Sequence, residues 1–304
     1  MNGQLRLTYA ALVASYIAKP LTGRGIRKLR EADRPREASC AWAALALLGR
    51  RQLLTSQQAK LDLAEAKLTC WVNVGLTLAP AGECSWAFQG PWTACPNATP
   101  GCIPTCVGNR GQGRSKKDGG GQDHGYVARC GRTIAWAFDS TRFEQLLVAE
   151  VNRKVYDVAY VGARLAFRAD VASDHQTLAA LIARETQAKP YGYTKRRECL
   201  DWDDGVHRIL SRSERNEAQV IDALDCGHSA AVVFDAPKGA LPTLWRGYPV
   251  IDGDVHDLWF LRLDGPTVVG LSLKGRRLEK AVARAKGFAV APETNNNPTA
   301  EVVA

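Results

Sequence analysis

Three cysteines in one short stretch are the residues whose types and spacing are best suited to chemistry. Cys95, Cys102 and Cys106 lie in the run Cys-Pro-Asn-Ala-Thr-Pro-Gly-Cys-Ile-Pro-Thr-Cys. Proline restricts the backbone at three positions of this run and glycine frees it at one, so we expect a loop rather than a helix or a strand. Such a loop can bring three thiols toward one point, which is what a metal ion or an iron–sulfur cluster requires.

The number and spacing of these thiols leave the identity of the bound group open. Three thiolate ligands suit an iron–sulfur cluster that keeps one iron open to a small molecule, and this is the cofactor that we expect first. Zinc is the alternative, with a fourth ligand from Cys84, Cys130 or His124. The six-and-three spacing differs from the paired two-residue spacing of many zinc sites. A loop without metal, with a disulfide or buried free thiols, is the third interpretation.

The composition is typical of a globular protein from a reducing compartment. The chain has 304 residues, of which 46% are hydrophobic, enough to bury a large core. Nine cysteines are an odd number in a chain too long to need disulfides, which favours free thiols or metal ligands and a cytoplasmic location. No apolar run reaches the roughly 18 residues of a membrane-spanning helix, so no membrane span is expected.

The net charge of +9 is concentrated at the start of the chain. Residues 1–60 contain eleven Lys and Arg but only three Asp and Glu, so the remainder is close to neutral. We expect residues 1–52 to be a basic helical extension separate from the core, with apolar helical spacing over 5–19 and 40–48. The phosphates of a nucleic acid could bind residues 1–60, which is the main alternative to a small-molecule partner.

From residue 53 onward, apolar strand-like runs alternate with helical stretches. We expect strands at 71–78, 158–167, 191–194, 207–210, 230–234 and 267–273, and helices at 143–155, 177–187 and 216–224. The alternation predicts an α/β domain over residues 53–287, with the cysteine loop at 84–106. Its parallel β/α array would be a partial or full TIM-like barrel, or else an open doubly wound sheet. Residues 288–304 are expected to form a disordered tail.

Polar side chains follow the predicted strands, at the edge where parallel β/α folds place their active sites. We expect five of them to position a small molecule or nucleotide by charge and hydrogen bonds, and three more to contact a cofactor. The catalytic candidates are Asp170, Asp174, Lys195, Arg212 and Glu214, and the cofactor-binding candidates are Arg168, Tyr193 and Lys274.

A second polar segment runs from Asp252 to Asp257. It carries three carboxylates and His256 within six residues. Such a set could bind a divalent cation, but a polar turn before the apolar run Leu-Trp-Phe-Leu is the favoured interpretation.

Several motifs follow one another in an order that carries a family resemblance. They are Leu76-Thr-Leu-Ala-Pro80, the run from Cys95 to Cys106, Tyr191-Gly-Tyr-Thr-Lys195, Ser211-Arg-Ser-Glu214, Ala231-Val-Val-Phe-Asp235 and Gly247-Tyr-Pro-Val-Ile-Asp-Gly-Asp254. Together they resemble the "gene product 88" proteins of bacteriophages and mobile elements, over residues 53–287. The resemblance implies an accessory protein of a phage or mobile element and assigns no activity. Residues 1–50 and the Gly119–Gly121 insertion look like departures from the family pattern.

The arrangement also resembles the radical S-adenosylmethionine enzymes, in which three cysteines in a loop after the first strand of a β/α barrel hold a cluster. Those enzymes generally space the cysteines by three and two residues, whereas this chain spaces them by six and three. A Gly-Gly-Glu-like segment after the next strand is also missing. The resemblance therefore implies a cluster and counts against S-adenosylmethionine.

Three functions follow from these observations. The first is a metal- or iron–sulfur-binding enzyme that acts on a small molecule or nucleotide through the three-cysteine site. The second is a nucleic-acid-binding accessory protein that uses the basic N-terminal arm. The third is a zinc-stabilised protein without catalysis.

Overall fold

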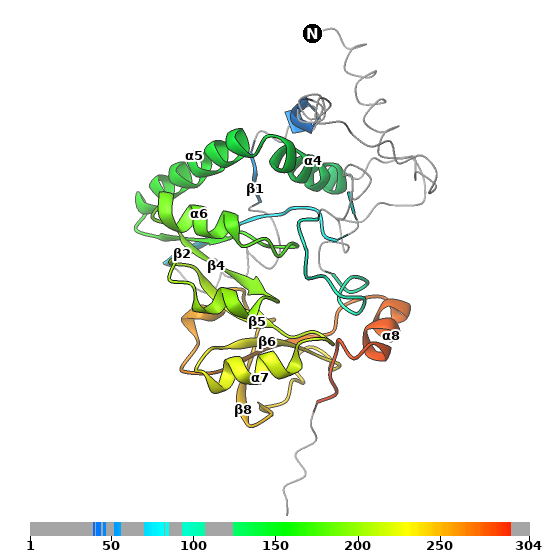
Figure 1. Cartoon of the computed structure of the whole chain (residues 1–304). Helices are drawn as coiled ribbons and strands as arrows, with labels where there is room; N and C mark the ends of the chain where they lie inside the picture. Colours follow the sequence, from blue (N-terminus) through cyan, green and yellow to red (C-terminus); the bar gives the residue numbers. More distant parts are fainter. Residues whose placement is uncertain are drawn as a thin grey trace, which may run out of the picture.

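The computed structural model describes residues 39, 41–43, 45–46, 52–55, 70–81, 83–84, 93–106 and 124–292. These residues form a nine-stranded sheet with the order β1-β2-β3-β4-β5-β6-β9-β8-β7 (Figure 1). The strands are β1 (Leu54–Thr55), β2 (Trp71–Leu76), β3 (Arg164–Arg168), β4 (Lys189–Thr194), β5 (His207–Ser211), β6 (Ala230–Phe234), β7 (Leu244–Trp245), β8 (Tyr248–Asp252) and β9 (Val268–Ser272). Only the outermost pairs, β1 with β2 and β7 with β8, are antiparallel.

The helices between β2 and β6 pack on one face of the sheet. They are α4 (His124–Phe138) and α5 (Ser140–Ala159) before β3, α6 (Thr177–Glu185) before β4, the 3₁₀ helix η5 (Arg197–Asp201) before β5, and α7 (Glu217–Asp225) before β6. Because β2 to β6 follow one another in the sheet in chain order, right-handed crossovers place their connections on the same side. The buried residues agree with this placement of the helices, since Phe167 of β3 shares a core cluster with Phe143 and Leu147 of α5. Helix α8 (Arg277–Ala285) follows β9.

The opposite face of the sheet is covered by an irregular segment instead of helices. This covering segment, residues 253–263, contains the 3₁₀ helix η6 (Trp259–Leu261). Leu258 and Trp259 are buried in one cluster with Tyr191 of β4 and Ile209 of β5. Strand side chains alternate between the two faces, so these two strand residues point away from the helices.

The sheet does not close into a barrel. Among the described strands, β1 and β7 are the two edges, and each pairs on one side only. After β6 the chain forms the β7–β8 hairpin, and β9 then enters between β6 and β8. Within the described part of the chain, no further β/α unit therefore extends the sheet round to β1. The mixed α/β class with a mostly parallel sheet is confirmed, whereas the closed TIM-like barrel is not what this chain forms.

Part of the expected N-terminal extension packs on the domain. Ala41 and Leu45 are buried, and Trp42 Nε1 donates a hydrogen bond to the Asp139 carboxylate at 2.9 Å. Most of residues 1–52, including the basic arm proposed to bind nucleic acid, lies outside the described residues. The same holds for the Gly119–Gly121 insertion.

The folded domain also continues beyond residue 287, which is the boundary predicted from the sequence. Phe288 and Ala289 are buried, and Val290 forms a parallel bridge with Phe234 of β6. Residues 288–290 therefore belong to the folded domain rather than to a disordered tail, because they bury apolar side chains and pair with a strand. Residues 293–304 lie outside the described part of the chain.

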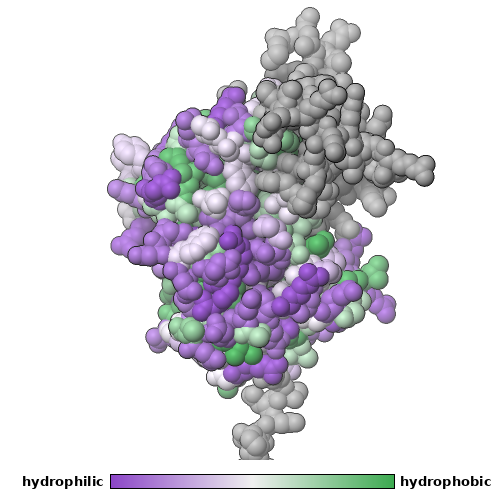
Figure 2. Space-filling model, viewed as in Figure 1, coloured by the Kyte–Doolittle hydropathy of each residue, from purple (hydrophilic) through white to green (hydrophobic). Residues whose placement is uncertain are grey.

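Hydrophobic side chains are gathered inside the domain. On the face shown in Figure 2, hydrophilic residues cover most of the described surface, and hydrophobic residues lie in small separate areas. Buried apolar clusters instead occupy both faces of the sheet. Within the described residues, no helix has both the length and the apolar character needed to cross a membrane.

Candidate functional site

The cysteine loop, residues 93–106, is a series of tight turns at the carboxyl edge of the sheet, next to α8 (Figure 1). Its backbone N–H groups donate to carbonyl oxygens a few residues earlier, as in Cys102 to Thr99 at 3.1 Å and Cys106 to Ile103 at 3.3 Å. The N–H of Thr99 also lies 3.1 Å from Cys102 Sγ and donates to it. The loop expected from the prolines is confirmed, and its own backbone holds one of the three thiols.

Glu214, which follows β5, attaches this loop to the sheet. Its Oε1 accepts a hydrogen bond from Gly101 N at 2.7 Å, and its Oε2 accepts one from Thr99 Oγ1 at 2.8 Å. The approach is close, since a Cβ on Gly101 would lie 2.5 Å from Phe288 Cβ and 2.9 Å from both Glu214 oxygens. The structure thus places Glu214, expected among the catalytic residues, where it positions the cysteines.

Asp174 connects the cysteine loop to β4. Its backbone N–H donates to Ala94 O at 2.9 Å. Its carboxylate accepts hydrogen bonds from Lys195 N and from Gln176 Nε2, both at 3.0 Å. Two of the predicted catalytic residues, Asp174 and Lys195, therefore lie directly beside the loop. Gln176 was not predicted, and nothing in its sequence position distinguishes it.

Burial and neighbouring charges act in opposite directions on the pKa of Cys95 and on the pKa of Lys195. Burial raises the pKa of Cys95 to about 12, while Lys195, the largest charge acting on this thiol, opposes the rise. Cys102 and Cys106 also act on Cys95, so the three sulfurs share one region. Burial acts to lower the pKa of Lys195, but the negative charges of Cys102 and Asp174 outweigh it, and the pKa is raised.

The three thiols supply suitable metal ligands, but they are not gathered at one coordination point. All three are partly buried. In the part of the chain that the structure describes, no three His, Cys, Asp or Glu side chains are placed to hold a metal ion. Cys84 and Cys130, considered as a fourth zinc ligand, are buried in the same core cluster, to which Cys130 belongs as a residue of α4. The side chain of His124 lies outside the described atoms.

Asp170 is a buried carboxyl group next to Asp174. Its Oδ1 accepts hydrogen bonds from Ser173 Oγ at 2.6 Å and His175 N at 3.0 Å, and Gln176 Nε2 lies 3.4 Å from its Oδ2. Burial raises the pKa of Asp170 to about 6, although the hydrogen bonds from Ser173 and His175 act against the rise. This carboxyl group can therefore exchange a proton close to neutral pH.

Arg168 and Tyr193, expected to contact a cofactor, lie against the covering segment. Arg168 Nη1 donates to both Asp257 oxygens, at 2.8 and 2.7 Å, and its guanidinium lies 4.7 Å from the centroid of the Tyr193 ring. Tyr191 donates its hydroxyl to Asp257 Oδ2 at 2.9 Å. Asp257 is fully buried, so this carboxylate balances the charge of Arg168 inside the protein.

Lys274, the third cofactor candidate, also pairs within the protein. Its Nζ lies 2.6 Å from Asp254 Oδ1, and Ser272 N donates to Asp254 Oδ2 at 2.9 Å. Asp252 accepts a hydrogen bond from the backbone N–H of Asp254 at 2.7 Å. The carboxylates of residues 252–257 therefore bond to protein groups, which agrees with a polar turn rather than a cation site.

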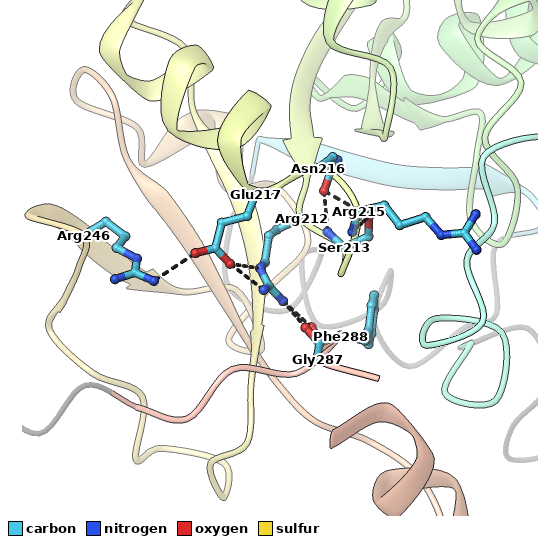
Figure 3. A network of polar contacts seen from close by, with 8 residues as sticks. All are labelled: Arg212, Ser213, Arg215, Asn216, Glu217, Arg246, Gly287 and Phe288. Carbon is cyan, nitrogen blue, oxygen red and sulfur yellow. Dashed lines mark hydrogen bonds and ion pairs between the residues drawn. The ribbon is translucent and has the colours of Figure 1, made fainter. Parts of the chain in front are cut away.

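Arg212, a further catalytic candidate, joins β5 to the C-terminal segment (Figure 3). Its Nη1 donates to the carbonyl oxygens of Gly287, at 2.5 Å, and Phe288, at 3.0 Å. Its Nε donates to Glu217 at 3.0 Å, and Arg246 binds the other oxygen of the same carboxylate at 2.9 Å. The guanidinium is buried, and its contacts hold the chain together.

Arg215 was not predicted from the sequence, although a second arginine after Arg212 could have drawn notice. It lies on the turn 213–216, in which Ser213 N donates to Asn216 Oδ1 at 2.6 Å. Its exposed side chain extends away from Arg212 and Glu217, toward the side on which the cysteine loop lies (Figure 3).

Comparison with known proteins identifies the family. A family model described as "Gene product 88" matches residues 47–291, most of the chain. The chain belongs to the gene product 88 family. No curated protein and no solved structure matches it. The comparisons thus confirm the first resemblance and give no support to the radical S-adenosylmethionine enzymes.

The gene product 88 region contains every predicted site residue. It includes the cysteine loop, all nine strands and the turns that carry Asp174, Lys195 and Glu214. Most of the basic arm, residues 1–46, precedes it. The cysteine site therefore belongs to the part of the chain that the family shares.

Proposed function

We propose that this gene product 88 family protein is a metal- or iron–sulfur-dependent enzyme that acts on a small molecule or nucleotide. Cys95, Cys102 and Cys106 would be the ligands. The observation that carries the proposal is the placement of three cysteines on one hydrogen-bonded loop, at the carboxyl edge of a mostly parallel sheet. Open α/β sheets bind their ligands at this edge.

The chemistry of the loop favours a soft metal centre. Thiolates prefer zinc and iron–sulfur clusters over hard cations such as magnesium. Cys95 is protonated at neutral pH, because its pKa lies near 12, so metal binding must release its proton. Binding also requires the three side chains to turn toward one point. A cluster held by three cysteines would supply an iron with an open position, and zinc would supply a Lewis acid.

Two neighbouring groups can assist a reaction at the loop. Asp170, with a pKa near 6, can accept or donate a proton in the range where general acid–base catalysis is most effective. Lys195 places a positive charge beside the sulfurs, where it can offset thiolate charge or attract a substrate. Arg212 and Glu214 contribute by holding the edge together.

Metal analysis of protein purified without oxygen tests the proposal. We expect the wild-type chain to contain iron with sulfide, or zinc, and the triple variant Cys95→Ala, Cys102→Ala, Cys106→Ala to have lost it. Matched controls are Cys70→Ala and Cys226→Ala, since both cysteines are exposed and lie outside the loop. The controls should keep the metal content of the wild type.

Two results would contradict the proposal. The first is a metal-free wild-type protein whose triple cysteine variant is equally stable. The second is bound zinc whose removal unfolds the protein, with no binding of a phosphorylated or other small molecule. That second result would instead indicate a zinc-stabilised protein without catalysis.

A further inference from the structure

Lys195 carries a positive charge that the described structure leaves unpaired. Its backbone N–H is held by Asp174 at 3.0 Å, which fixes the residue at the end of β4. Its side chain is only partly exposed, yet its ammonium group forms no hydrogen bond or ion pair with any residue that the structure describes. Three other cations among the predicted site residues each pair with a carboxylate. They are Arg168, Arg212 and Lys274.

The groups that act electrostatically on Lys195 do so without a direct bond to its ammonium group among the described residues. Asp174 is one of these groups, and its two oxygens accept hydrogen bonds from Gln176 and from the Lys195 backbone. The donors of the ammonium group therefore have no direct partner among the described residues, and they can donate to an anion from outside the chain.

Arg215 offers a second unpaired cation at the same loop. Its neighbour Glu214 bonds to Gly101, which brings the turn 213–216 into contact with the loop. The guanidinium of Arg215 has no hydrogen bond or ion pair within the described residues, and it extends away from the Arg212–Glu217 network (Figure 3). Two cations without a bonding partner among the described residues therefore follow β4 and β5. Lys195 bonds through its backbone to Asp174, which bonds to the cysteine loop, and Arg215 lies next to Glu214, which bonds to the loop directly.

We propose that Lys195, assisted by Arg215, binds the phosphate group of a small-molecule substrate at the cysteine loop. Lysine binds phosphate as a point charge, and arginine matches its oxygens with paired N–H donors. The carboxyl edge of a parallel sheet is also where α/β folds bind phosphates. This inference depends on the proposed function for the reaction alone. What it adds is the chemical class of the substrate, a small molecule that carries a phosphate group.

Titration of the full-length protein with inorganic phosphate, followed by phosphorus NMR, tests this inference. Lys195→Met should weaken phosphate binding by about tenfold, since a hydrogen bond to a charged group is lost. Lys195→Arg should retain most of the affinity. Lys189→Met is the matched control, because Lys189 begins the same strand and lies at its opposite end. The control should bind phosphate like the wild type.

Arg215→Gln keeps the test valid if Lys195→Met does not fold, because Arg215 is exposed on a turn. We expect this variant to weaken phosphate binding by about threefold. Phosphate binding that is equally strong in Lys195→Met, Arg215→Gln and Lys189→Met would overturn the inference. So would a wild-type chain that binds no phosphate.

Metal content measured in the same samples separates this inference from the proposed function. Phosphate binding that depends on Lys195, in a chain without metal, would support the anion site and contradict the metal enzyme. Metal in the wild type, together with phosphate binding that is unchanged in Lys195→Met, would support the metal enzyme and contradict the anion site. Loss of metal together with phosphate in Lys195→Met would mean that the lysine serves the thiolates, and would overturn the anion site.

Discussion

Gly101 sets how closely the cysteine loop approaches Glu214 and the C-terminal segment. In Gly101→Ala the new Cβ would lie 2.5 Å from Phe288 Cβ, so the loop or the segment must shift. We expect a loss of about 1–3 kcal/mol in the free energy of unfolding, measured with urea. Gly192→Ala is the matched control, since a Cβ there meets nothing within 4 Å, and it should unfold like the wild type. Equal stability of the two variants would contradict the close approach.

Asp170 should make stability depend on pH in the weakly acidic range. Burial raises its pKa from the ordinary 3.8 to about 6, so the folded state binds this proton more tightly than the unfolded state. The stability contributed by Asp170 therefore falls as the pH rises from about 4 through about 6, by up to about 3 kcal/mol. Asp170→Asn should remove this dependence. Urea unfolding of both proteins across that range measures the difference, and parallel curves would argue against it.

The location of the candidate residues could be predicted from the sequence, but their roles could not. Asp174 and Lys195 were expected because they follow apolar strands, and the edge that they share follows from a parallel sheet. Glu214 was given the same role, yet it bonds to Gly101, 113 residues earlier. Arg168 pairs with Asp257, 89 residues later. Residue type alone cannot tell a charge bound by a distant partner from one left for a ligand.

The regular elements were predictable where one physical signal dominated. Strands β4, β5 and β6 are short buried runs, and the sequence located each of them to within two residues. Helix α4 was missed, because it contains Gly125 and Gly131 and the β-branched Thr133 and Ile134, which have low helix propensity. Gly131 has a packing reason, since a Cβ there would lie 3.2 Å from the Leu45 side chain.

The covering segment is held on the sheet by the buried ion pair of Arg168 and Asp257. Asp257→Asn leaves the charge of Arg168 without its carboxylate in a buried position, so we expect a loss of about 3–5 kcal/mol in unfolding free energy. Asp201→Asn is the matched control, because Asp201 pairs with Arg197 at the surface, where the loss should stay below about 1 kcal/mol. Urea unfolding followed by tryptophan fluorescence measures both, and similar small losses would contradict a holding role for the pair.

The whole sheet divides the molecule into a helix-covered side and a side covered by residues 253–263, and the cysteine loop lies at the carboxyl edge. Alternating strands and helices predicted the parallel sheet correctly. They could not predict closure, because closure depends on where the last strands enter. Here β9 inserts between β6 and β8, which leaves the sheet open.

The C-terminal segment, residues 287–290, completes the domain next to the cysteine loop. Arg212 binds the carbonyl groups of Gly287 and Phe288, and Phe288 shares a buried cluster with Cys102. A chain that ends at residue 286 loses these contacts, whereas a chain that ends at residue 292 keeps them. We expect the shorter chain to be less stable by about 2–4 kcal/mol, from the lost burial of Phe288 and the unpaired N–H groups of Arg212.

Urea unfolding of the two shortened chains, side by side, isolates the effect of residues 287–292. The shorter chain should also expose the cysteine loop, because Phe288 packs against the turn that carries Gly101. Faster amide hydrogen exchange at Gly101 and Cys102 would report this exposure before global unfolding. Equal stability and equal exchange in the two chains would mean that the C-terminal segment lies on the domain without holding it. With the segment in place, Glu214 holds the cysteine loop and Arg212 holds the C-terminal segment that packs beside it, so two residues that follow β5 fix a site built from distant parts of the chain.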